Sequence, residues 1–425
     1  MKTEHVDIAI VGAGPAGLEA AHVATQAGAR VALIDDNPRA GGQIWRQGPG
    51  AAPSPPLRSW LDTTGARPNL DLMNASKVAA ALDGKRLLLE RDGAPCAVGY
   101  AKLILATGAR ERLLPFEGWT LPGVTGAGGL QALIKGGVPV RGERIVVAGS
   151  GPLLLAAADT ARRHGAHVRA VVEQAPLRRV ARFVASLAAT PSKFAQAAAL
   201  VSALGVARYR AGSVVVKAHG VERVEGVTIR TGAGEETIEA ERIACGYGLV
   251  PNATLGLALG CDVDPGGAIA VDDHQRTSLA DVFAAGECTG IGGMELARVE
   301  GACAAYAALG ASVDPRLERE RRRWRAFAAR VERAFALGPA ARALPPATTL
   351  ICRCEDVSVG EVASHANWRD AKLHTRCGMG PCQGRICGET AALYFGWPRA
   401  TAHEPLVPVR IDTLLAACES SEEAD

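Results

Sequence analysis

The stretch VDIAIVGAGPAG, at residues 6–17, decides the fold of this 425-residue chain. Its first six residues are mostly apolar, as expected for a parallel β-strand that is buried on both faces. A glycine-rich turn then leads into a helical run at residues 18–26, and a second apolar run at 30–34 ends in Asp35-Asp36. Strand, turn, helix, strand and terminal acid in this order predict a dinucleotide-binding βαβ unit.

Each glycine of the turn has a mechanical role. Gly12 makes the tight turn, Gly14 lets the backbone approach a pyrophosphate, and Gly17 lets helix and strand pack closely. The N-terminus of the helix faces the phosphates with its unpaired N–H groups and the positive end of its dipole. Asp35 is then placed to accept a hydrogen bond from a ribose hydroxyl.

Three further motifs indicate which dinucleotide binds. PRAGGQIWR at residues 38–46 resembles the glycine pair that lines FAD in flavoproteins with two dinucleotide-binding domains. LILATGA at 103–109 resembles the strand at which the chain leaves the FAD domain in those proteins, and DVFAAGE at 281–287 resembles their closing strand. The resemblance places Glu287 on the ribityl chain of the flavin. Together with the first turn, these motifs predict FAD.

The expected FAD contacts are the key residues of these motifs together with one valine: Gly12, Gly14, Pro15, Ala16, Gly17, Asp35, Asp36, Gly42, Gln43, Arg46, Val78, Ala106, Thr107, Gly108, Gly286 and Glu287. No C-x2-C or C-x4-C pair lies near either glycine-rich turn, and the first cysteine is Cys96. A disulfide reductase needs such a pair against its flavin. We therefore do not expect that class of enzyme.

A second unit of the same kind occupies the middle of the chain. RIVVA at residues 144–148 reads as a strand, GSGPLL at 149–154 as its turn, and a later strand ends at Glu173. Leu154 stands where the third glycine belongs, and its side chain would hold helix and strand apart. We expect the fold to be retained. NAD(P) or another nucleotide could bind, or the domain could be purely structural.

Five of the eleven cysteines lie close together near the end of the chain: Cys352, Cys354, Cys377, Cys382 and Cys387. Four thiolates usually hold a [2Fe–2S] centre. Glycines in the intervening loop let backbone N–H groups point at the sulfurs and tune the potential. The predicted ligands are Cys352, Cys354 and Cys382, with either Cys377 or Cys387 as the fourth. A zinc site is the alternative, although zinc favours C-x2-C spacing over C-x-C.

Bulk properties exclude several classes of function. A net charge of +3 gives no reason to expect a nucleic-acid partner. No apolar run reaches the roughly 18 residues needed to span a bilayer, and the N-terminus lacks the order of a signal peptide. We expect a cytoplasmic protein, with peripheral association with the respiratory chain allowed. Clustered cysteines in that compartment more often bind metal than form disulfides.

These features together resemble the FAD-containing α-type subunit of heteromeric amino- and imino-acid dehydrogenases. The family includes the A subunits of opine oxidases, the B subunits of hydrogen cyanide synthases and D-hydroxyproline dehydrogenase. The most specific matching stretches are residues 41–46, ATGARER at 106–112 and TRCGMGPCQGRICG at 375–388. The last is similar to a [2Fe–2S] domain like that of bacterioferritin-associated ferredoxin.

The resemblance implies an α/β flavoprotein with two dinucleotide-binding domains of the glutathione-reductase (Rossmann) type and a small C-terminal [2Fe–2S] domain. The expected domains are an FAD domain at 1–115 and 250–312, a middle domain at 116–249, a linker helix within 313–346 and the [2Fe–2S] domain at 347–425. Helical spacing of apolar residues supports the linker helix.

The implied activity is that of one component of an oxidoreductase acting on CH–NH or CH–NH2 donors. A β-type flavoprotein partner, similar to FAD-dependent amino-acid oxidases, would oxidise an amino acid, a proline-type imino acid or an opine, and a small ferredoxin-like subunit is allowed. No residue of this chain is expected to be catalytic, because its histidines are scattered. The alternative is a stand-alone NAD(P)H-dependent flavoprotein reductase that passes electrons through its own iron–sulfur centre.

Overall fold

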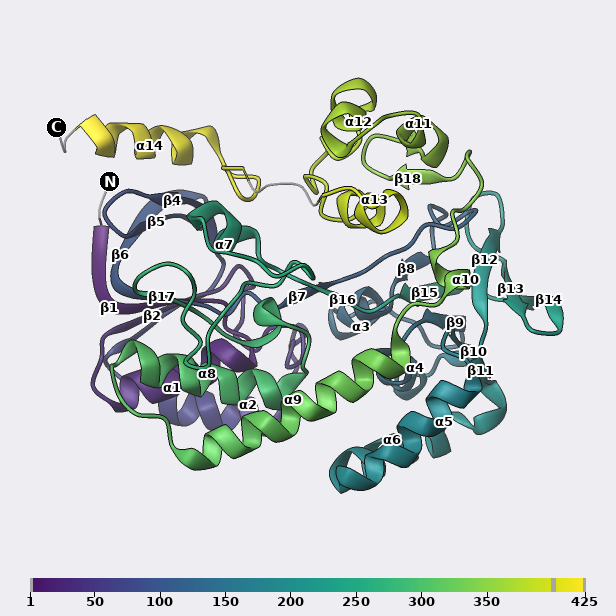
Figure 1. The fold of residues 1–425 in the computed structure, drawn as a ribbon, viewed down its shortest axis with the longest axis horizontal. Coiled ribbons are helices and arrows are strands. Elements are labelled where there is room, and N and C mark those ends of the chain that lie inside the picture. Colours follow the sequence, from purple (N-terminus) through teal and green to yellow (C-terminus); the bar gives the residue numbers. More distant parts are fainter. Residues whose placement is uncertain (1–2, 399–402, 423–425) are drawn as a thin grey trace. The chain divides into compact units, whose positions relative to one another are not determined.

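The computed structural model describes residues 3–398 and 403–422 (Figure 1). Contacts divide the chain into two compact units. Unit 1 comprises Met1–Arg110, Val250–Ala328 and Thr401–Asp425, and unit 2 comprises Glu111–Leu249 and Ala329–Ala400. The FAD domain predicted from the sequence corresponds to most of unit 1, and the predicted middle domain to most of unit 2.

Within its described residues, unit 1 is built on a seven-stranded sheet in the order β3-β2-β1-β6-β5-β4, with β17 paired to β6. Strands β1, β2, β3, β6 and β17 pair in parallel, whereas β4 and β5 extend the sheet in antiparallel fashion. The strands are β1 (Thr3–Val11), β2 (Val31–Ile34), β3 (Leu70–Met73), β4 (Ser76–Leu82), β5 (Arg86–Arg91), β6 (Ala94–Leu105) and β17 (Val282–Ala284).

Strand β1 shows why the sheet is buried on both faces. Ile8 and Ile10 enter one core cluster, and Ala9 and Val11 enter another, as the two-residue period of a strand requires. The helices of unit 1 are α1 (Pro15–Gln26), α2 (Pro55–Trp60), α7 (Thr254–Leu259), α8 (Met294–Ala308) and α14 (Ile411–Glu422), with short turns η1 (Leu61–Gly65) and η4 (Gly286–Thr289). Helices α1 and α8 lie side by side on one face of the sheet (Figure 1).

The C-terminal segment belongs to unit 1. The Arg410 N–H and the Thr413 hydroxyl donate to Glu90 Oε2 at 2.7 and 3.1 Å, and the Ala81 N–H donates to Glu404 at 2.7 Å. This differs from the domain division expected from the sequence, which groups residues 347–425 together. The physical reason is that α14 and the segment before it pack against β4, β5 and β6.

Unit 2 contains a second Rossmann sheet. Its five parallel strands run in the order β11-β10-β9-β15-β8. They are β8 (Val124–Gly126), β9 (Arg144–Gly149), β10 (His167–Glu173), β11 (Tyr209–Ala211) and β15 (Arg242–Gly246). A three-stranded antiparallel sheet adds β12 (Val214–His219), β13 (Gly226–Thr231) and β14 (Gly234–Glu239). Short strands β7 (Ala109–Glu111) and β16 (Leu249–Pro251) lie where the chain passes between units.

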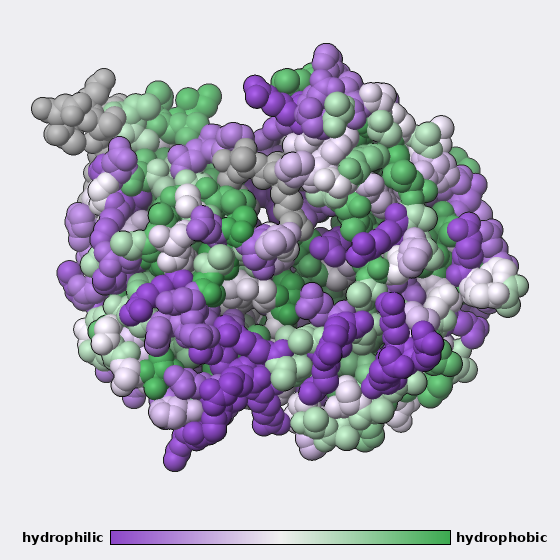
Figure 2. Space-filling model, in the orientation of Figure 1, coloured by the Kyte–Doolittle hydropathy of each residue, from purple (hydrophilic) through white to green (hydrophobic). Residues whose placement is uncertain are grey.

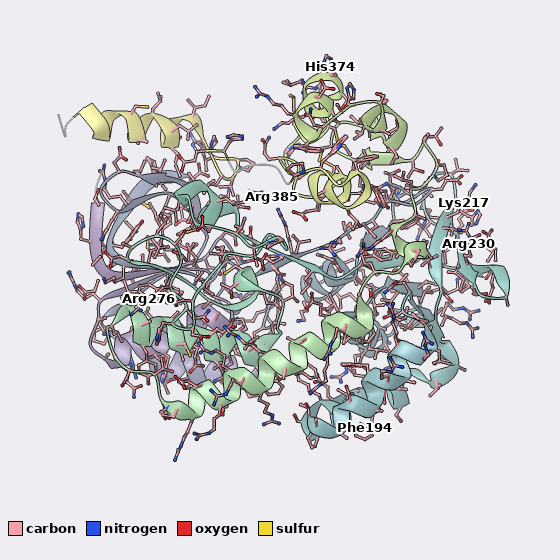
Figure 3. All side chains as sticks on the ribbon, viewed as in Figure 1. Phe194, Lys217, Arg230, Arg276, His374 and Arg385 are labelled. Carbon is pink, nitrogen blue, oxygen red and sulfur yellow. The ribbon has the colours of Figure 1, made fainter. Side chains whose placement is uncertain are left out.

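The middle-domain helices are α3 (Ala127–Lys135), α4 (Leu153–Arg163), α5 (Leu177–Ser186) and α6 (Pro191–Leu204), with short turns η2 (Leu187–Ala189) and η3 (Val206–Arg208). Leu154, which stands where the third glycine of the turn belongs, is 1% exposed and packs in the core with Val147. The leucine therefore contributes to the core, and the fold is retained. Helix α6 is largely exposed, and Figure 3 shows Phe194 on its outer side. Its surface is pale green in Figure 2 because the helix is rich in alanine.

A single 21-residue helix, α9 (Pro315–Phe335), forms where the sequence predicts the linker helix. Its residues up to Ala328 are grouped with unit 1 and those from Ala329 with unit 2. Hydrophilic side chains gather over its N-terminal part, in purple in Figure 2. A short helix, α10 (Pro339–Arg342), follows.

The cysteine-rich module is part of unit 2. It consists of β18 (Leu350–Cys352), β19 (Val357–Ser358), α11 (Val359–Ala363), α12 (Trp368–Thr375) and α13 (Cys387–Phe395). Trp119 Nε1 donates to the Leu350 carbonyl at 2.6 Å, and the Thr390 hydroxyl donates to that of Leu113 at 3.1 Å. The predicted fold class is confirmed, with two Rossmann sheets and a small C-terminal module. In the part of the chain that the structure describes, no helix is both long and apolar enough to cross a bilayer.

Candidate functional site

The glycine-rich turn of unit 1 has the geometry expected from its sequence. Gly12 has a φ of +109°, and a Cβ built on it would lie 2.2 Å from the Ala106 carbonyl oxygen. A Cβ on Gly17 would lie 1.8 Å from the carbonyl oxygen of Gly12. Both positions therefore require glycine. The close approach also brings the Ala-Thr-Gly motif against the turn, as the FAD prediction requires.

The second glycine of the turn meets the glycine pair that follows the acids. Gly42 has a φ of +56°, and a Cβ on it would lie 2.8 Å from the Cα of Gly14. The Gly41 N–H donates to the Ala13 carbonyl at 2.8 Å. Two motifs that are separate in the sequence thus form one cradle lined by backbone. Such a surface fits the close approach of a pyrophosphate.

Asp35 closes this cradle at the end of β2 and is 7% exposed. Its Oδ2 accepts the Ala13 N–H at 2.6 Å, and its Oδ1 accepts the backbone and side-chain N–H groups of Asn37, both at 2.8 Å. Arg46 in turn donates to Asn37 Oδ1 at 3.0 Å and to Gln43 Oε1 at 3.1 Å. The predicted contacts Asp35, Gln43 and Arg46 are therefore joined in one hydrogen-bonded chain through Asn37, which the sequence analysis missed.

The Ala-Thr-Gly motif is fixed by Asn252. The Thr107 hydroxyl donates to the Asn252 carbonyl at 2.6 Å, and the Asn252 N–H donates to the Gly108 carbonyl at 2.9 Å. Cys288 is fully buried, and its thiol donates to the Leu105 carbonyl at 3.3 Å. It belongs to the core of unit 1, and burial raises its pKa to about 11. Val78 is half-buried on β4 and packs against the same core.

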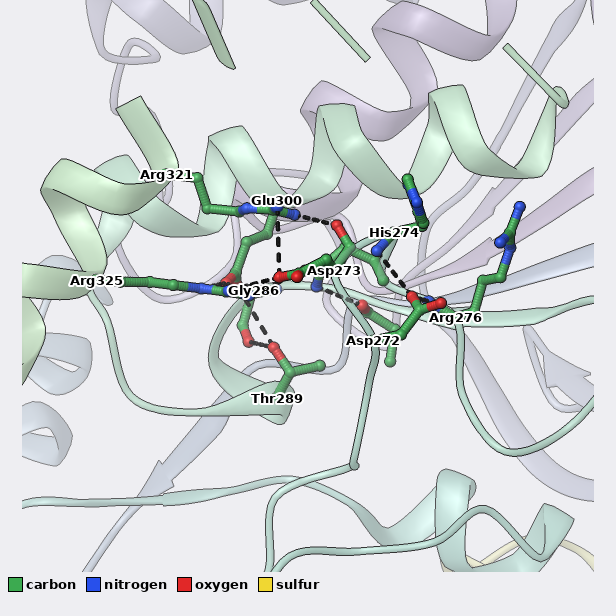
Figure 4. Close-up of polar contacts among 11 residues, drawn as sticks. Asp272, Asp273, His274, Arg276, Gly286, Thr289, Glu300, Arg321 and Arg325 are labelled. Atoms are coloured by element: carbon green, nitrogen blue, oxygen red, sulfur yellow. Dashed lines mark hydrogen bonds and ion pairs between the residues drawn. The ribbon is translucent and has the colours of Figure 1, made fainter. Parts of the chain in front are cut away.

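The closing motif is held by a buried acid from α8. The Gly286 N–H and the Thr289 hydroxyl lie 3.3 and 3.4 Å from Glu300 Oε2, and Arg325 on α9 lies 3.3 Å from Glu300 Oε1 (Figure 4). Burial raises the pKa of Glu300, although Arg325 opposes the shift. Neighbouring Glu287 is also mostly buried, which raises its pKa. Neither Glu300 nor Arg325 is predicted from the sequence, in which the signal for Glu300 is an acid within an apolar helix.

The five clustered cysteines form two groups. The Sγ atoms of Cys352, Cys377 and Cys387 are buried and lie within 4.8 Å of one another. Cys354 Sγ lies 3.8 Å from Cys382 Sγ. Two thiolates bound to one tetrahedral metal at about 2.3 Å are separated by about 3.8 Å. The second group thus has the spacing of two ligands on a single metal ion, and the first offers three thiols for a second ion.

The three thiols of the first group contact one another and shift one another's pKa values. Hydrogen bonds from the Cys377 and Cys387 thiols lower the pKa of Cys352, and the same contacts raise the pKa of Cys387. The thiolate is the form that binds metal. The donor set therefore fits an iron–sulfur centre. Cys377 and Cys387 both have their Sγ atoms within 4.8 Å of Cys352 Sγ, so either can be the fourth ligand.

The backbone around these cysteines is constrained. Asp356, Arg376 and Gln383 adopt φ values of +52°, +66° and +50° although none is a glycine, and each lies within two residues of a cluster cysteine. Such strain persists only where the surroundings fix it, and it concentrates at functional sites. A Cβ on Gly380 would lie 2.3 Å from the Cβ of Cys354, so this position has no room for a side chain.

Trp368 supports the cysteine loop from α12. A Cβ on Gly378 would lie 2.6 Å from its ring, and one on Gly384 would lie 3.2 Å from it. The indole therefore lies on the two glycines that shape the loop between the cysteines. The sequence analysis did not identify Trp368, because nothing in its local pattern distinguishes it from an ordinary core tryptophan.

In the middle domain, Glu173 occupies the place that Asp35 has in unit 1. Its Oε2 accepts the Gly151 N–H at 2.7 Å and its Oε1 accepts the Ala175 N–H at 2.8 Å. The side chain has no exposed surface, and burial raises its pKa to about 7. The second βαβ unit therefore also has an acid-to-turn contact, although the donor, Gly151, lies one position later in the turn than Ala13 does in unit 1.

Comparison with known proteins agrees with this geometry. The model of the pyridine nucleotide-disulphide oxidoreductase family matches residues 6–305. The A subunit of opine oxidase from Rhizobium meliloti (strain 1021) is 34% identical over 419 residues, covering 90% of this chain and 91% of that protein. The HcnB subunit of hydrogen cyanide synthase from Pseudomonas aeruginosa is 33% identical over 427 residues, covering 89% of this chain and 90% of that protein.

Among solved structures, L-proline dehydrogenase from P. horikoshii has a TM-score of 0.70 at 18% identity, covering 97% of this chain and 80% of that one. At this identity the likeness shows the fold alone. Together, the family match and the two curated relatives identify a flavoprotein oxidoreductase. The chain belongs to the pyridine nucleotide-disulphide oxidoreductase family and, within it, to the group of opine oxidase A subunits and hydrogen cyanide synthase B subunits.

Proposed function

We propose that this chain is the electron-transfer subunit of a heteromeric dehydrogenase or oxidase that acts on an amino acid, a proline-type imino acid or an opine. The observation that carries the proposal is the cysteine group of unit 2, in which Cys354 and Cys382 have the spacing of paired metal ligands. It stands in a chain whose other unit has an FAD-type glycine cradle. A nucleotide cradle and a set of metal-binding thiols in one protein suit electron transfer rather than bond chemistry on a substrate.

Residues of three predicted motifs would hold the cofactors. The N-terminus of α1 would face the pyrophosphate of FAD, Asp35 would accept from its ribose, and Glu287 would hold its ribityl chain. Cys354 and Cys382 would hold one iron of a [2Fe–2S] centre. Cys352, together with either Cys377 or Cys387, would hold the other iron. When bound, FAD and the iron–sulfur centre would supply a path for electrons out of the substrate-oxidising partner.

Substrate oxidation is assigned to a partner protein. Both curated relatives are named as subunits of larger enzymes. Three of the nine histidines of this chain, His22, His164 and His219, hydrogen-bond to Thr64, Thr160 and Thr228. Each contact holds one ring nitrogen of the imidazole within this chain. The partner would be a β-type flavoprotein similar to amino-acid oxidases, and a small ferredoxin-like subunit fits the same assembly.

The test is reconstitution. The chain is purified alone and together with a candidate amino-acid oxidase-like partner chain, and dye-linked oxidation of proline, hydroxyproline, glycine and an opine is measured. We expect turnover only when both chains are present. Full-rate oxidation by the isolated chain would overturn the assignment of substrate chemistry to the partner.

A second candidate function is an NAD(P)H-dependent reductase, for which the only support is the second Rossmann sheet in the described part of unit 2. Anaerobic addition of NADH or NADPH to the isolated chain separates the two functions. A flavin spectrum that does not bleach supports the electron-transfer role within a larger enzyme. Rapid bleaching supports the reductase.

A further inference from the structure

The glycine turn of the middle domain is covered by the chain itself. The Ser150 hydroxyl donates to the carbonyl of Phe335, the last residue of α9, at 2.7 Å. Gln174 Nε2 donates to the carbonyls of Phe335 and Ala336 at 3.3 and 3.2 Å, and the Gly338 N–H returns a hydrogen bond to Gln174 Oε1 at 2.9 Å. In Figure 1 the C-terminal end of α9 lies beside α4. Residues 335–338 therefore lie across the turn.

A pyrophosphate occupies this position in a nucleotide-binding βαβ unit. In unit 1 the second glycine, Gly14, faces only the backbone of Gly42. In unit 2 the corresponding glycine is Gly151, and a Cβ on it would lie 3.9 Å from Phe335. The Phe335 ring also packs edge-on against Phe183, with centroids 5.1 Å apart. The side chain and backbone of Phe335 thus lie where a coenzyme would have to approach the glycine turn.

The end of α9 and a pyrophosphate carry charge of the same sign. The last carbonyls of a helix carry a partial negative charge, and the N-terminus of a helix carries a partial positive one. The end of α9 therefore presents the same sign of charge to the start of α4 as a phosphate would. Arg179 adds a further donor, at 3.3 Å from the Ala336 carbonyl. Ser150 and Gln174 are only 5% and 7% exposed, so these polar groups are satisfied within the protein.

We infer that residues 335–338 fill the pyrophosphate position at the glycine turn of the middle domain, and that NAD(P)H and other nucleotides do not bind there. The domain retains the Rossmann fold, and its glycine turn binds the C-terminal end of α9 in place of a nucleotide. This inference rests on contacts within unit 2 alone and does not depend on the proposed FAD or iron–sulfur sites. Electrons must then enter this protein from something other than a nicotinamide bound in the middle domain.

Hydrogen–deuterium exchange on the full chain, followed by mass spectrometry, tests the inference. Peptides that span residues 149–154 and 335–338 should both be protected. Gln174→Ala removes the four hydrogen bonds that this side chain makes with Ser150, Phe335, Ala336 and Gly338. It should speed exchange in both peptides together by about tenfold or more. Gln131→Ala is the matched control, because Gln131 donates to Thr160 at 3.0 Å elsewhere in the same unit. It should leave both peptides unchanged.

A second variant guards against a general folding defect. Ser150→Ala removes a single hydroxyl and should speed exchange at 335–338 without changing the strands of the sheet. Millimolar NADH, NADPH or ATP added to the wild-type chain should change neither peptide. Nucleotide binding that deprotects residues 335–338 while protecting 149–154 would overturn the inference. So would Gln174→Ala and Ser150→Ala variants that both leave residues 335–338 exchanging as in the wild type.

Discussion

Glu300 on α8 lies 3.3 Å from Arg325 on α9, measured from Oε1 to Nη2, while its other carboxylate oxygen receives the Gly286 N–H at 3.3 Å. A buried acid thus joins a helix cation to the turn that carries Glu287. Burying a carboxylate is costly unless its charge is paired and hydrogen-bonded. The arrangement therefore points to a positioning role for Glu300, exerted through the backbone of the turn.

Glu300→Gln should loosen this turn. We expect a loss of about 1–3 kcal/mol in the free energy of unfolding, because the Gly286 N–H and Arg325 lose their charged acceptor. We also expect less FAD to remain bound after gel filtration and a shift in the flavin absorption bands. Glu19→Gln is the control, since Glu19 pairs with Arg298 at the surface at 2.9 Å. Equal FAD content and equal spectra in the two variants would show that Glu300 has no positioning role.

Gly17→Ala should abolish FAD binding. The added Cβ would lie 1.8 Å from the Gly12 carbonyl oxygen, so α1 must move away from the turn. Overpacking of this kind costs about 1–3 kcal/mol or more. Gly129→Ala, at a helix position with open space around it, should be neutral or stabilising. The measurement is FAD per chain together with the unfolding free energy, and a Gly17→Ala variant with full FAD content would contradict the assignment of the cradle.

The pH dependence of stability should report Glu173. Burial raises its pKa from 4.5 to about 7. Between these values the folded chain holds a proton that the unfolded chain has lost, so stability falls as the pH rises from about 4.5 through about 7. The loss from this one group amounts to at most about 3 kcal/mol.

Glu173→Gln should therefore flatten this part of the stability profile, measured by urea unfolding at a series of pH values. Glu117→Gln is the control, because Glu117 is exposed and pairs with Lys217 on β12. Its profile should keep the slope of the wild type. If Glu173→Gln keeps that slope as well, Glu173 is ionised in the folded protein throughout this range.

The cysteines should divide into essential and exchangeable ligands. Cys354→Ser and Cys382→Ser should each lose most of the iron, because their 3.8 Å pair has no substitute nearby in the described structure. Of Cys377→Ser and Cys387→Ser, one should retain iron, since three thiols serve two positions. Cys418→Ser, on α14, is the control. Iron and acid-labile sulfide per chain are measured, and full iron in Cys382→Ser would refute the proposed pairing.

The sequence predicts those features that depend on short-range spacing. Gly12, Gly17 and Asp35 are recognisable because one βαβ unit fixes their order, and the five cysteines because they lie in one window. Contacts between distant segments leave no such pattern. Ser150 hydrogen-bonds to Phe335, which lies 185 residues later in the chain. The charged residues of α9 predict a solvent-exposed face, although one of them, Arg325, pairs with the buried Glu300.

The same limit explains the C-terminal segment. Residues 403–422 follow the cysteine module in the sequence, and nothing local in that segment marks it as part of another unit. The acceptor that holds it, Glu90, lies 320 residues before Arg410. Position along the chain therefore suggests one domain, whereas long-range hydrogen bonds place the segment in unit 1.

The central claim is that electrons from a partner-oxidised amine reach this chain's cysteine site, and anaerobic reduction followed by electron paramagnetic resonance tests it most directly. The complex with its partner is mixed with its amino- or imino-acid donor. We predict that the flavin bleaches and a reduced [2Fe–2S] signal appears, and that Cys382→Ser abolishes the signal but not the bleaching. A wild-type complex that turns over its donor without any such signal, or that carries zinc at this site, would contradict the account.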